Sequence, residues 1–168
     1  FDRSNLAVFG LSSITVDSAI AEVSARLDDN EEFGSEATYN LGAGYQFIPE
    51  LGVKASYGTA FKAPNLYQQY APTYGTSDLK PEESDAIELS FSGIIQNVYW
   101  SLTGYDYKIT NLIDYHPTTY KYLNVDGETH IQGVELVAEF DTGIVLHQLS
   151  ADYKDAEGDD GKQLQRRA

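Results

Sequence analysis

Cysteine and methionine are both absent from this 168-residue chain, and basic residues are scarce. Without cysteine the chain has no disulfide, no thiolate metal site and no cysteine nucleophile. It carries only 11 lysines and arginines but 26 aspartates and glutamates, which gives a formal net charge of −15. Nucleic-acid binding needs a basic surface, so this charge excludes nucleic acid as a partner. It argues equally against simple adsorption to anionic lipid.

Long apolar runs are missing as well. No segment approaches the roughly 18 apolar residues of a membrane helix, and no signal peptide opens the chain. The mean hydropathy of −0.37 is that of many soluble proteins, yet a membrane β-barrel gives the same average because its residues alternate between lipid and water. The nucleophile-elbow, HExxH, Walker and dinucleotide-binding motifs are absent too. An enzyme is therefore not predicted.

The clearest pattern is a strict alternation over residues 51–62. One face carries Leu51, Val53, Ala55, Tyr57, Thr59 and Phe61, and the other carries glycine, lysine, serine and alanine. A period of two residues predicts a β-strand. Twelve residues would extend for about 40 Å, which is longer than most globular strands and enough to cross a bilayer when tilted.

The same alternation recurs along the chain. It predicts strands within residues 1–16, 21–28, 38–47, 51–62, 87–92, 98–105, 133–140 and 145–153, with 120–125 as a further candidate. Short connections are expected near residues 17, 49, 95 and 142, and long ones at 28–36, 62–84, 108–128 and 154–165. We therefore predict an all-β, antiparallel up-and-down meander of about eight strands, with short turns at one end and long loops at the other.

The alternation does not show whether the apolar face of the sheet points inward or outward. A soluble barrel would bury its apolar face, including Leu41, Val53 and Leu89, whereas a membrane barrel would turn that face to lipid. The opposite face carries charges that suit a water-filled interior: Glu22, Arg26, Lys54, Glu88, Glu135 and Glu139. The apolar face has aliphatic residues in mid-strand and aromatic residues toward the ends, which favours the membrane barrel. The first strand is apolar on both faces, so its facing stays open.

Two sets of motifs carry a family resemblance. The segment Phe61-Lys62-Ala63-Pro64-Asn65-Leu66-Tyr67, with Gln68-Gln69-Tyr70 and Asp78-Leu79-Lys80-Pro81-Glu82-Glu83-Ser84, resembles a signature of TonB-dependent outer-membrane receptors. Residues that are similar to the vitamin B12 (cobalamin) receptor branch follow downstream: Trp100, Gly104-Tyr105, Asp106, Leu112-Ile113-Asp114-Tyr115, Lys121-Tyr122, Gly133-Val134-Glu135, Phe140-Asp141-Thr142-Gly143, Asp152-Tyr153, Asp155-Ala156 and Arg166-Arg167-Ala168. The resemblance extends from about Ala7 to Ala168.

The resemblance implies a multi-pass protein of a Gram-negative outer membrane, in contact with lipid and lipopolysaccharide. It implies that residues 1–168 form one segment of a barrel of about 22 strands, with the plug domain and the C-terminal strands outside it. Such a receptor binds cobalamin outside the cell and moves it into the periplasm, with energy from the TonB complex acting through the plug. By itself, an open sheet has two unpaired edges, so we expect the segment to close into a small barrel or to pair with a second copy.

Two alternatives remain. The chain could be a complete eight-stranded outer-membrane barrel with a structural or adhesive role, because eight strands is a closed size. It could also belong to a TonB-dependent receptor for another substrate, such as a siderophore.

The resemblance also supplies the candidate ligand-binding residues. Arg166 matches the first arginine of the Arg-Arg-Ala motif, a position that contacts cobalamin in the family, and a guanidinium suits the amides and phosphate of that ligand. The alternative is an ordinary lumen-facing arginine. Tyr67, Tyr70 and Tyr74 in the 62–84 loop are weaker candidates for contact with the corrin ring, because exposed tyrosines are common on such loops.

No cofactor and no metal site are assigned. The acidic clusters at Asp28–Glu32 and Asp155–Asp160 lack the spacing of a calcium loop, so we interpret them as solvated loop charge, with divalent bridging to lipopolysaccharide as the alternative. The resemblance implies calcium-ordered loops in the full-length receptor, but these resemble segments upstream of this chain, so no calcium site is assigned here. The histidines His116, His130 and His147 are scattered, which does not indicate catalysis.

Overall fold

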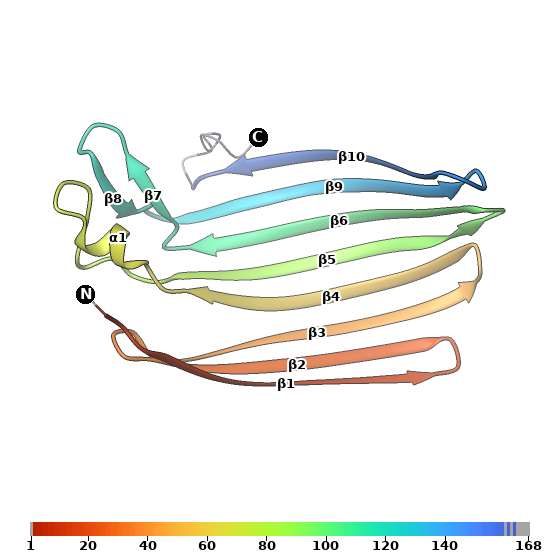
Figure 1. Cartoon of the computed structure of the whole chain (residues 1–168), viewed down its shortest axis with the longest axis horizontal. Helices are drawn as coiled ribbons and strands as arrows, with labels where there is room; N and C mark the ends of the chain where they lie inside the picture. Colours follow the sequence, from red (N-terminus) through yellow and green to blue (C-terminus); the bar gives the residue numbers. More distant parts are fainter. Residues whose placement is uncertain (1, 160, 162, 164–168) are drawn as a thin grey trace.

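The computed structural model describes residues 2–159, 161 and 163, and in this part of the chain eight long strands form one antiparallel sheet (Figure 1). The strands are β1 (Asn5–Val16), β2 (Ala19–Asn30), β3 (Gly34–Ile48), β4 (Leu51–Lys62), β5 (Glu82–Ile95), β6 (Val98–Thr110), β9 (Glu128–Asp141) and β10 (Leu146–Glu157). They lie side by side in that order. The predicted meander is confirmed.

Two long excursions project from the same end of this sheet, and the short turns β1–β2, β3–β4, β5–β6 and β9–β10 lie at the other end (Figure 1). The first excursion holds the helix α1 (Leu66–Tyr70), and the second holds a small hairpin of β7 (Ile113–His116) and β8 (Lys121–Asn124). The strand candidate at 120–125 is thus confirmed. We call residues 63–81 and 111–127 together the cap. No helix among the described residues is long and apolar enough to cross a membrane.

Two predicted loops are wrong in their extent. The loop expected at 28–36 is a turn of residues 31–33, because the β2–β3 ladder continues through Asp28↔Glu36 to Asn30↔Gly34. The Asn30 side chain accepts hydrogen bonds from the amides of Glu32 and Phe33, and Gly34 takes a positive φ of 79°, which glycine allows without strain. The loop expected from residue 154 likewise starts only after β10 ends at Glu157.

The strand register separates the two faces as the alternation predicted. Leu41 lies opposite Tyr57, and Tyr57 opposite Ile87, on the apolar face. Lys54 lies opposite Ser90 on the other, which we call the polar face. The open question about the first strand is answered by its pairing with β2, where Phe9 lies opposite Arg26. Phe9 therefore belongs to the polar face, even though it is apolar.

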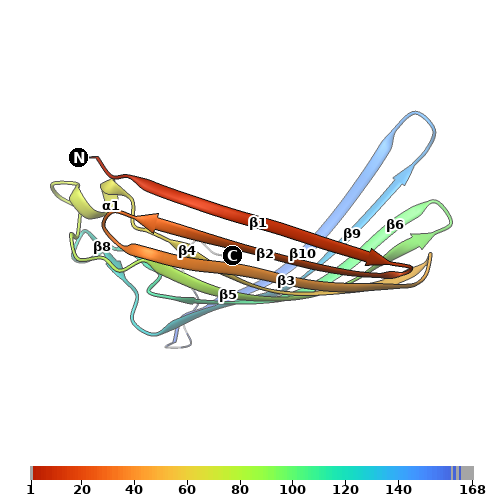
Figure 2. The same ribbon diagram turned by 90° about the horizontal axis from the view of Figure 1, so that it is seen from below.

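The apolar face does not enclose a core. Leu41 is 48% exposed, Leu89 45% and Leu136 48%, so the alternative of a soluble barrel that buries this face is not supported. The sheet is curved and open (Figure 2), and β1 and β10 form its two edges. The expected closure into a small barrel is therefore not seen, while pairing with a second copy stays a prediction.

Buried side chains concentrate at the cap end instead. Leu79, Leu112 and Ile113 are buried, and so is Pro64 at the base of the first excursion. Buried polar residues, Asn30, Gln69 and Thr129, lie at the same end. The cap is thus the part of the described chain that is packed like the interior of a globular protein.

Candidate functional site

The two excursions of the cap are joined by the side chain of Asn124. Its Oδ1 accepts a hydrogen bond from the amide of Lys80 (2.8 Å), and its Nδ2 donates to the carbonyls of Lys80 (2.9 Å) and Asn111 (2.7 Å). The amide of Tyr122 also donates to the carbonyl of Tyr74 (2.9 Å). Because these bonds connect residues far apart in sequence, the excursions form one unit.

A row of four tyrosines runs across the junction between the excursions. Tyr67 meets Tyr122 edge to face at 6.1 Å between ring centroids, Tyr122 meets Tyr115 at 5.7 Å, and Tyr115 meets Tyr74 at 6.1 Å. Each such pair contributes about 0.5–1.5 kcal/mol beyond the area it buries. Burial raises the pKa of the Tyr115 hydroxyl above its ordinary value. Tyr67 is 57% exposed, so this end of the tyrosine row is open to a ligand.

Helix α1 carries the exposed end of that row, and local sequence explains the helix. The Asn65 side chain accepts a hydrogen bond from the Gln68 amide (2.8 Å), and the Gln68 side chain accepts one from the Asn65 amide (2.9 Å). This reciprocal capping box satisfies amides that a helix start otherwise leaves unpaired. Pro64, which has no amide hydrogen, immediately precedes Asn65, the N-cap residue of α1.

The side chain of Glu32, in the turn between β2 and β3, binds two residues of α1. Its Oε1 accepts hydrogen bonds from Gln69 Nε2 (2.7 Å) and the Tyr70 hydroxyl (2.9 Å). Partial burial alone would raise the pKa of the Glu32 carboxyl, but these bonds and Arg3 outweigh it and hold that pKa below its ordinary value. The hydrogen bond to Glu32 also raises the pKa of the Tyr70 hydroxyl.

The polar face below the cap is a network of ion pairs and tyrosines. Lys54 pairs with Glu22 (2.6 Å), and Lys62 with Glu82 (2.8 Å). Tyr105 stacks on the next tyrosine of that face, Tyr107, at 4.9 Å. A side chain at Gly133 would lie only 2.5 Å from the Tyr105 hydroxyl, so glycine lets this ring lie flat against β9.

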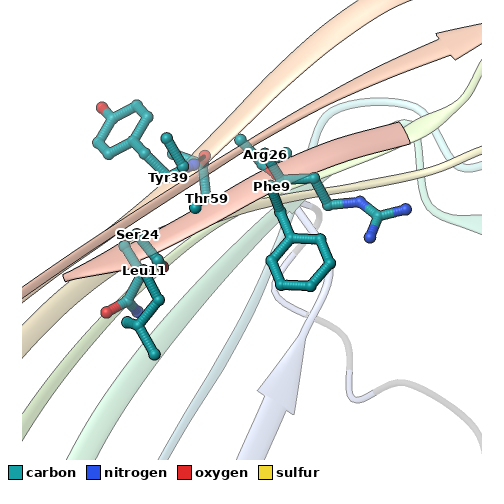
Figure 3. Close-up of a pocket in the computed structure, with 10 residues that line it drawn as sticks. Phe9, Leu11, Ser24, Arg26, Tyr39 and Thr59 are labelled. Carbon is teal, nitrogen blue, oxygen red and sulfur yellow. Dashed lines mark hydrogen bonds between the residues drawn. The ribbon is translucent and has the colours of Figure 1, made fainter. Parts of the chain in front are cut away.

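A shallow hollow lies across β1, β2, β3 and β4 (Figure 3). Phe9 and Arg26 project to one side of the strands and Tyr39 projects to the other. The residues that line the hollow therefore do not direct their side chains into one common space. This hollow is not an enclosed ligand pocket.

The sequence-predicted site residues have different outcomes. Tyr67 and Tyr74 belong to the tyrosine row, whereas the Tyr70 hydroxyl is bound to Glu32. Arg166 lies outside the described residues, so its role stays a prediction. Sequence reasoning missed Arg3, Glu32 and the two middle members of the row, Tyr115 and Tyr122. The capping spacing of Asn65 and Gln68 was the available signal for α1.

No group of three or more potential metal ligands comes together among residues 2–159, 161 and 163. The three histidines lie apart: His116 ends β7, His130 is near Glu128 at 3.8 Å, and His147 stacks on Phe140 at the opposite end of the sheet.

This chain is similar to known proteins over its full length. Residues 1–168 match the family model described as TonB dependent receptor-like, beta-barrel. Proteins named vitamin B12 transporter BtuB, from strains of Vibrio cholerae serotype O1, are 61% identical over 168 residues, which is 100% of this chain and 28% of theirs. The chain thus spans just over a quarter of the length of these curated relatives.

Solved structures share the architecture at much lower identity. The siderophore receptor PirA from Acinetobacter baumannii superposes with a TM-score of 0.78 and 21% identity, over 95% of this chain and 29% of that one. A structure titled copper transporter OprC gives a TM-score of 0.76 and 15% identity, over 95% of this chain and 30% of that one. At this level of identity the likeness concerns the fold alone.

Proposed function

Because the chain belongs to the β-barrel family of TonB-dependent receptors, we propose that it is a barrel segment of an outer-membrane transporter that takes up vitamin B12 (cobalamin). The observation that carries this proposal is the 61% identity to vitamin B12 transporters over all 168 residues. Its location is the outer membrane of a Gram-negative bacterium. The plug domain and the remaining strands belong to other parts of the same protein.

In this proposal the apolar face of the sheet meets lipid, and the polar face lines the lumen of the barrel. The short turns lie in the periplasm and the cap lies outside the cell, as in outer-membrane barrels generally. The half-exposed side chains Leu41, Leu89 and Leu136 support this facing, since exposing apolar surface to water costs free energy and contact with hydrocarbon does not. Lys54 and Glu22 then lie in a wet interior, where an ion pair costs little desolvation.

The protein performs no covalent chemistry on its ligand in this scheme. Cobalamin binds at the extracellular mouth, where the tyrosine row offers flat apolar surfaces. By its match to the arginine of the family motif, Arg166 is the proposed charged donor to the ligand. Energy from the TonB complex, acting through the plug, then admits the ligand to the periplasm. The alternative of a siderophore receptor has weaker support, because the siderophore receptor PirA shares 21% identity with this chain and the vitamin B12 transporters share 61%.

The test uses the full-length protein in a bacterial strain that lacks its own vitamin B12 receptor. We expect growth on limiting cobalamin, and saturable binding of labelled cyanocobalamin to outer-membrane vesicles, without binding of a ferric siderophore. The absence of cobalamin binding would contradict the proposed function.

The ligand contact is tested by Arg166→Ala in the same vesicles. Loss of a charge-assisted hydrogen bond of about 1.5–3 kcal/mol corresponds to a fall in affinity of roughly 10- to 100-fold. Arg167→Ala, which removes the neighbouring arginine, is the matched control and should bind cobalamin more tightly than Arg166→Ala. Equal affinities in the wild type and Arg166→Ala would remove Arg166 from the site.

A further inference from the structure

We propose that Arg3 is a positioning residue that latches the cap over the polar face, so that the tyrosine row is in place before a ligand arrives. The latch consists of Arg3, Glu32 and Gln69. Its effect on cobalamin capture rests on the proposed function, whereas the latch itself does not.

The guanidinium of Arg3 joins three segments of the chain. Its Nη2 donates to the carbonyl of Pro64 (2.8 Å), and its Nη1 donates to Gln69 Oε1 (3.1 Å) and lies 3.4 Å from Glu32 Oε2. Its other side lies 5.4 Å above the ring of Phe33. Only 17% of the Arg3 side chain is exposed. Arg3, two residues before β1, is therefore inserted between the β2–β3 turn and the cap.

The three members of the latch form a closed ring of hydrogen bonds. Arg3 donates to Gln69, Gln69 donates to Glu32 (2.7 Å), and Glu32 accepts from Arg3. Gln69 is 3% exposed, so its amide needs these partners. In such a ring each side chain is already ordered by the other two, so the entropy lost for each bond is smaller than in an isolated pair.

The hydrogen bonds of the latch hold the cap on the side of the polar face. The β1–β2 register pairs Asn5 with Asn30 on that face. The Glu31 amide donates to the carbonyl of Ser4 just beyond this pair (3.2 Å), so that Arg3 and the turn residue Glu32 come next to each other at the end of the ladder. The start of β1 lies beside α1 in both views (Figures 1 and 2). The cap is covalently joined to β4, β5, β6 and β9, so the latch adds a link to the other side of the sheet, at the start of β1 and the β2–β3 turn.

An arginine is needed at this position for a geometric reason. A planar guanidinium directs two nitrogens at two acceptors on different residues, here Pro64 and Gln69, while a lysine ammonium is a single point charge. We therefore expect Arg3→Lys to keep the charge but not to restore the position of the cap.

The experiment measures the distance between the cap and the β2–β3 turn by spin labels in the full-length protein, in a lipid bilayer and without cobalamin. Labels at Ser77→Cys in the cap and Ser35→Cys beside the turn report on the latch, and this chain has no other cysteine. We expect a narrow distance distribution in the wild type and a longer, broader one in Arg3→Gln and in Arg3→Lys. Arg26→Gln removes an arginine of the same face that pairs with Asp28 in β2, and serves as the control that should stay narrow.

A second variant distinguishes the latch from a general loss of structure. Because Arg3 and Glu32 act through one ring, Arg3→Gln and Glu32→Gln should broaden the distribution together no more than either does alone. Additive broadening, or a wild-type distribution in Arg3→Gln, would overturn the latch. An unchanged distribution with Arg3→Lys would overturn the need for a guanidinium.

Cobalamin binding provides the functional readout. If the latch keeps the binding-competent cap populated, Arg3→Gln lowers the apparent affinity in proportion to the lost population, an expected fall of roughly 3- to 10-fold, while the distance distribution at saturating cobalamin matches that of the wild type. Unchanged affinity together with a displaced cap would overturn the positioning role. A wild-type protein that binds no cobalamin would instead count against the proposed function and leave the distance result standing.

Discussion

Leu136 in β9 and Leu112 in the cap are the same side chain in opposite settings. Leu136 is 48% exposed on a broad apolar face, and Leu112 is 2% exposed in the second excursion. Backbone hydrogen bonds between neighbouring strands hold the sheet together from β1 to β10, and the apolar side chains of the sheet are exposed to its surroundings. The cap buries its apolar side chains and joins its parts through side-chain hydrogen bonds, such as those of Asn124.

This difference shows that the two regions depend on different solvents. A sheet with half-exposed leucines gains its stability from lipid, because hydrocarbon replaces the core that the sheet does not have. In the proposed orientation the cap lies in water and must supply its own core. Substitutions of identical chemistry should therefore have unequal effects in the two regions.

The largest effect is expected from a charge on the lipid side of the sheet. Leu89→Arg in the full-length protein should destabilise the barrel by about 2–4 kcal/mol, the cost of arginine near the middle of a bilayer. Denaturant unfolding in phospholipid vesicles measures this loss. Ser90→Arg, on the polar face one position away, is the control and should cost much less. Equal losses in both variants would show that the two faces do not have different surroundings.

A smaller effect is expected from a cavity in the cap. Leu112→Ala should lower the free energy of opening the cap by about 2–3 kcal/mol, at the low end for a buried leucine because this core is small. Leu136→Ala should cost less than about 1 kcal/mol, since its surroundings can close the gap. Hydrogen exchange of the amides in β7 and β8 reports on the cap, and unfolding in vesicles reports on the sheet. Similar costs at the two leucines would contradict the comparison.

The smallest effect is expected from pH, at the junction between the two regions. Glu32 has a lowered pKa in the folded protein, so its ionised form stabilises α1. That contribution is complete above the unfolded pKa of about 4.3 and is lost as the pH falls through the lower, folded value. A spin label on α1 should therefore keep its mobility from pH 7 to about 5 and become more mobile below about 4. Glu32→Gln should abolish this step, and a step that persists in Glu32→Gln would assign it to another group.

Much of the sheet was predictable from sequence, because strand periodicity is a local property. The alternation over residues 51–62 gave the bounds of β4 as observed, Leu51–Lys62. The acidic ends of β2 and β10 were wrongly assigned to loops, because backbone ladders continue where side chains are polar, as the pair Asp28↔Glu36 shows. Charged residues indicate that a segment is exposed to solvent. A β-strand nevertheless continues through solvent-exposed residues as long as its backbone pairs with a neighbouring strand.

The site was less predictable, because it depends on contacts between distant segments. Tyr67 and Tyr74 were found through their aromatic character and their position in a long loop. Arg3 was not, because its partners Pro64 and Gln69 lie 61 and 66 residues away and meet it only once β1 has paired with β2 and the first excursion has folded back. The role of Arg166 remains a prediction.

The hydrogen bonds of Asn124 have a consequence for how such receptors diversify. Residue 124 lies in one excursion and its partner Lys80 in the other, so neither excursion is a free-standing module. A chimera that received residues 111–127 from a relative with a different residue at position 124 would leave the backbone groups of Lys80 without these hydrogen bonds. Recombination between relatives should therefore preserve the two excursions as a pair, even though about 30 residues of sheet and turn separate them in the gene.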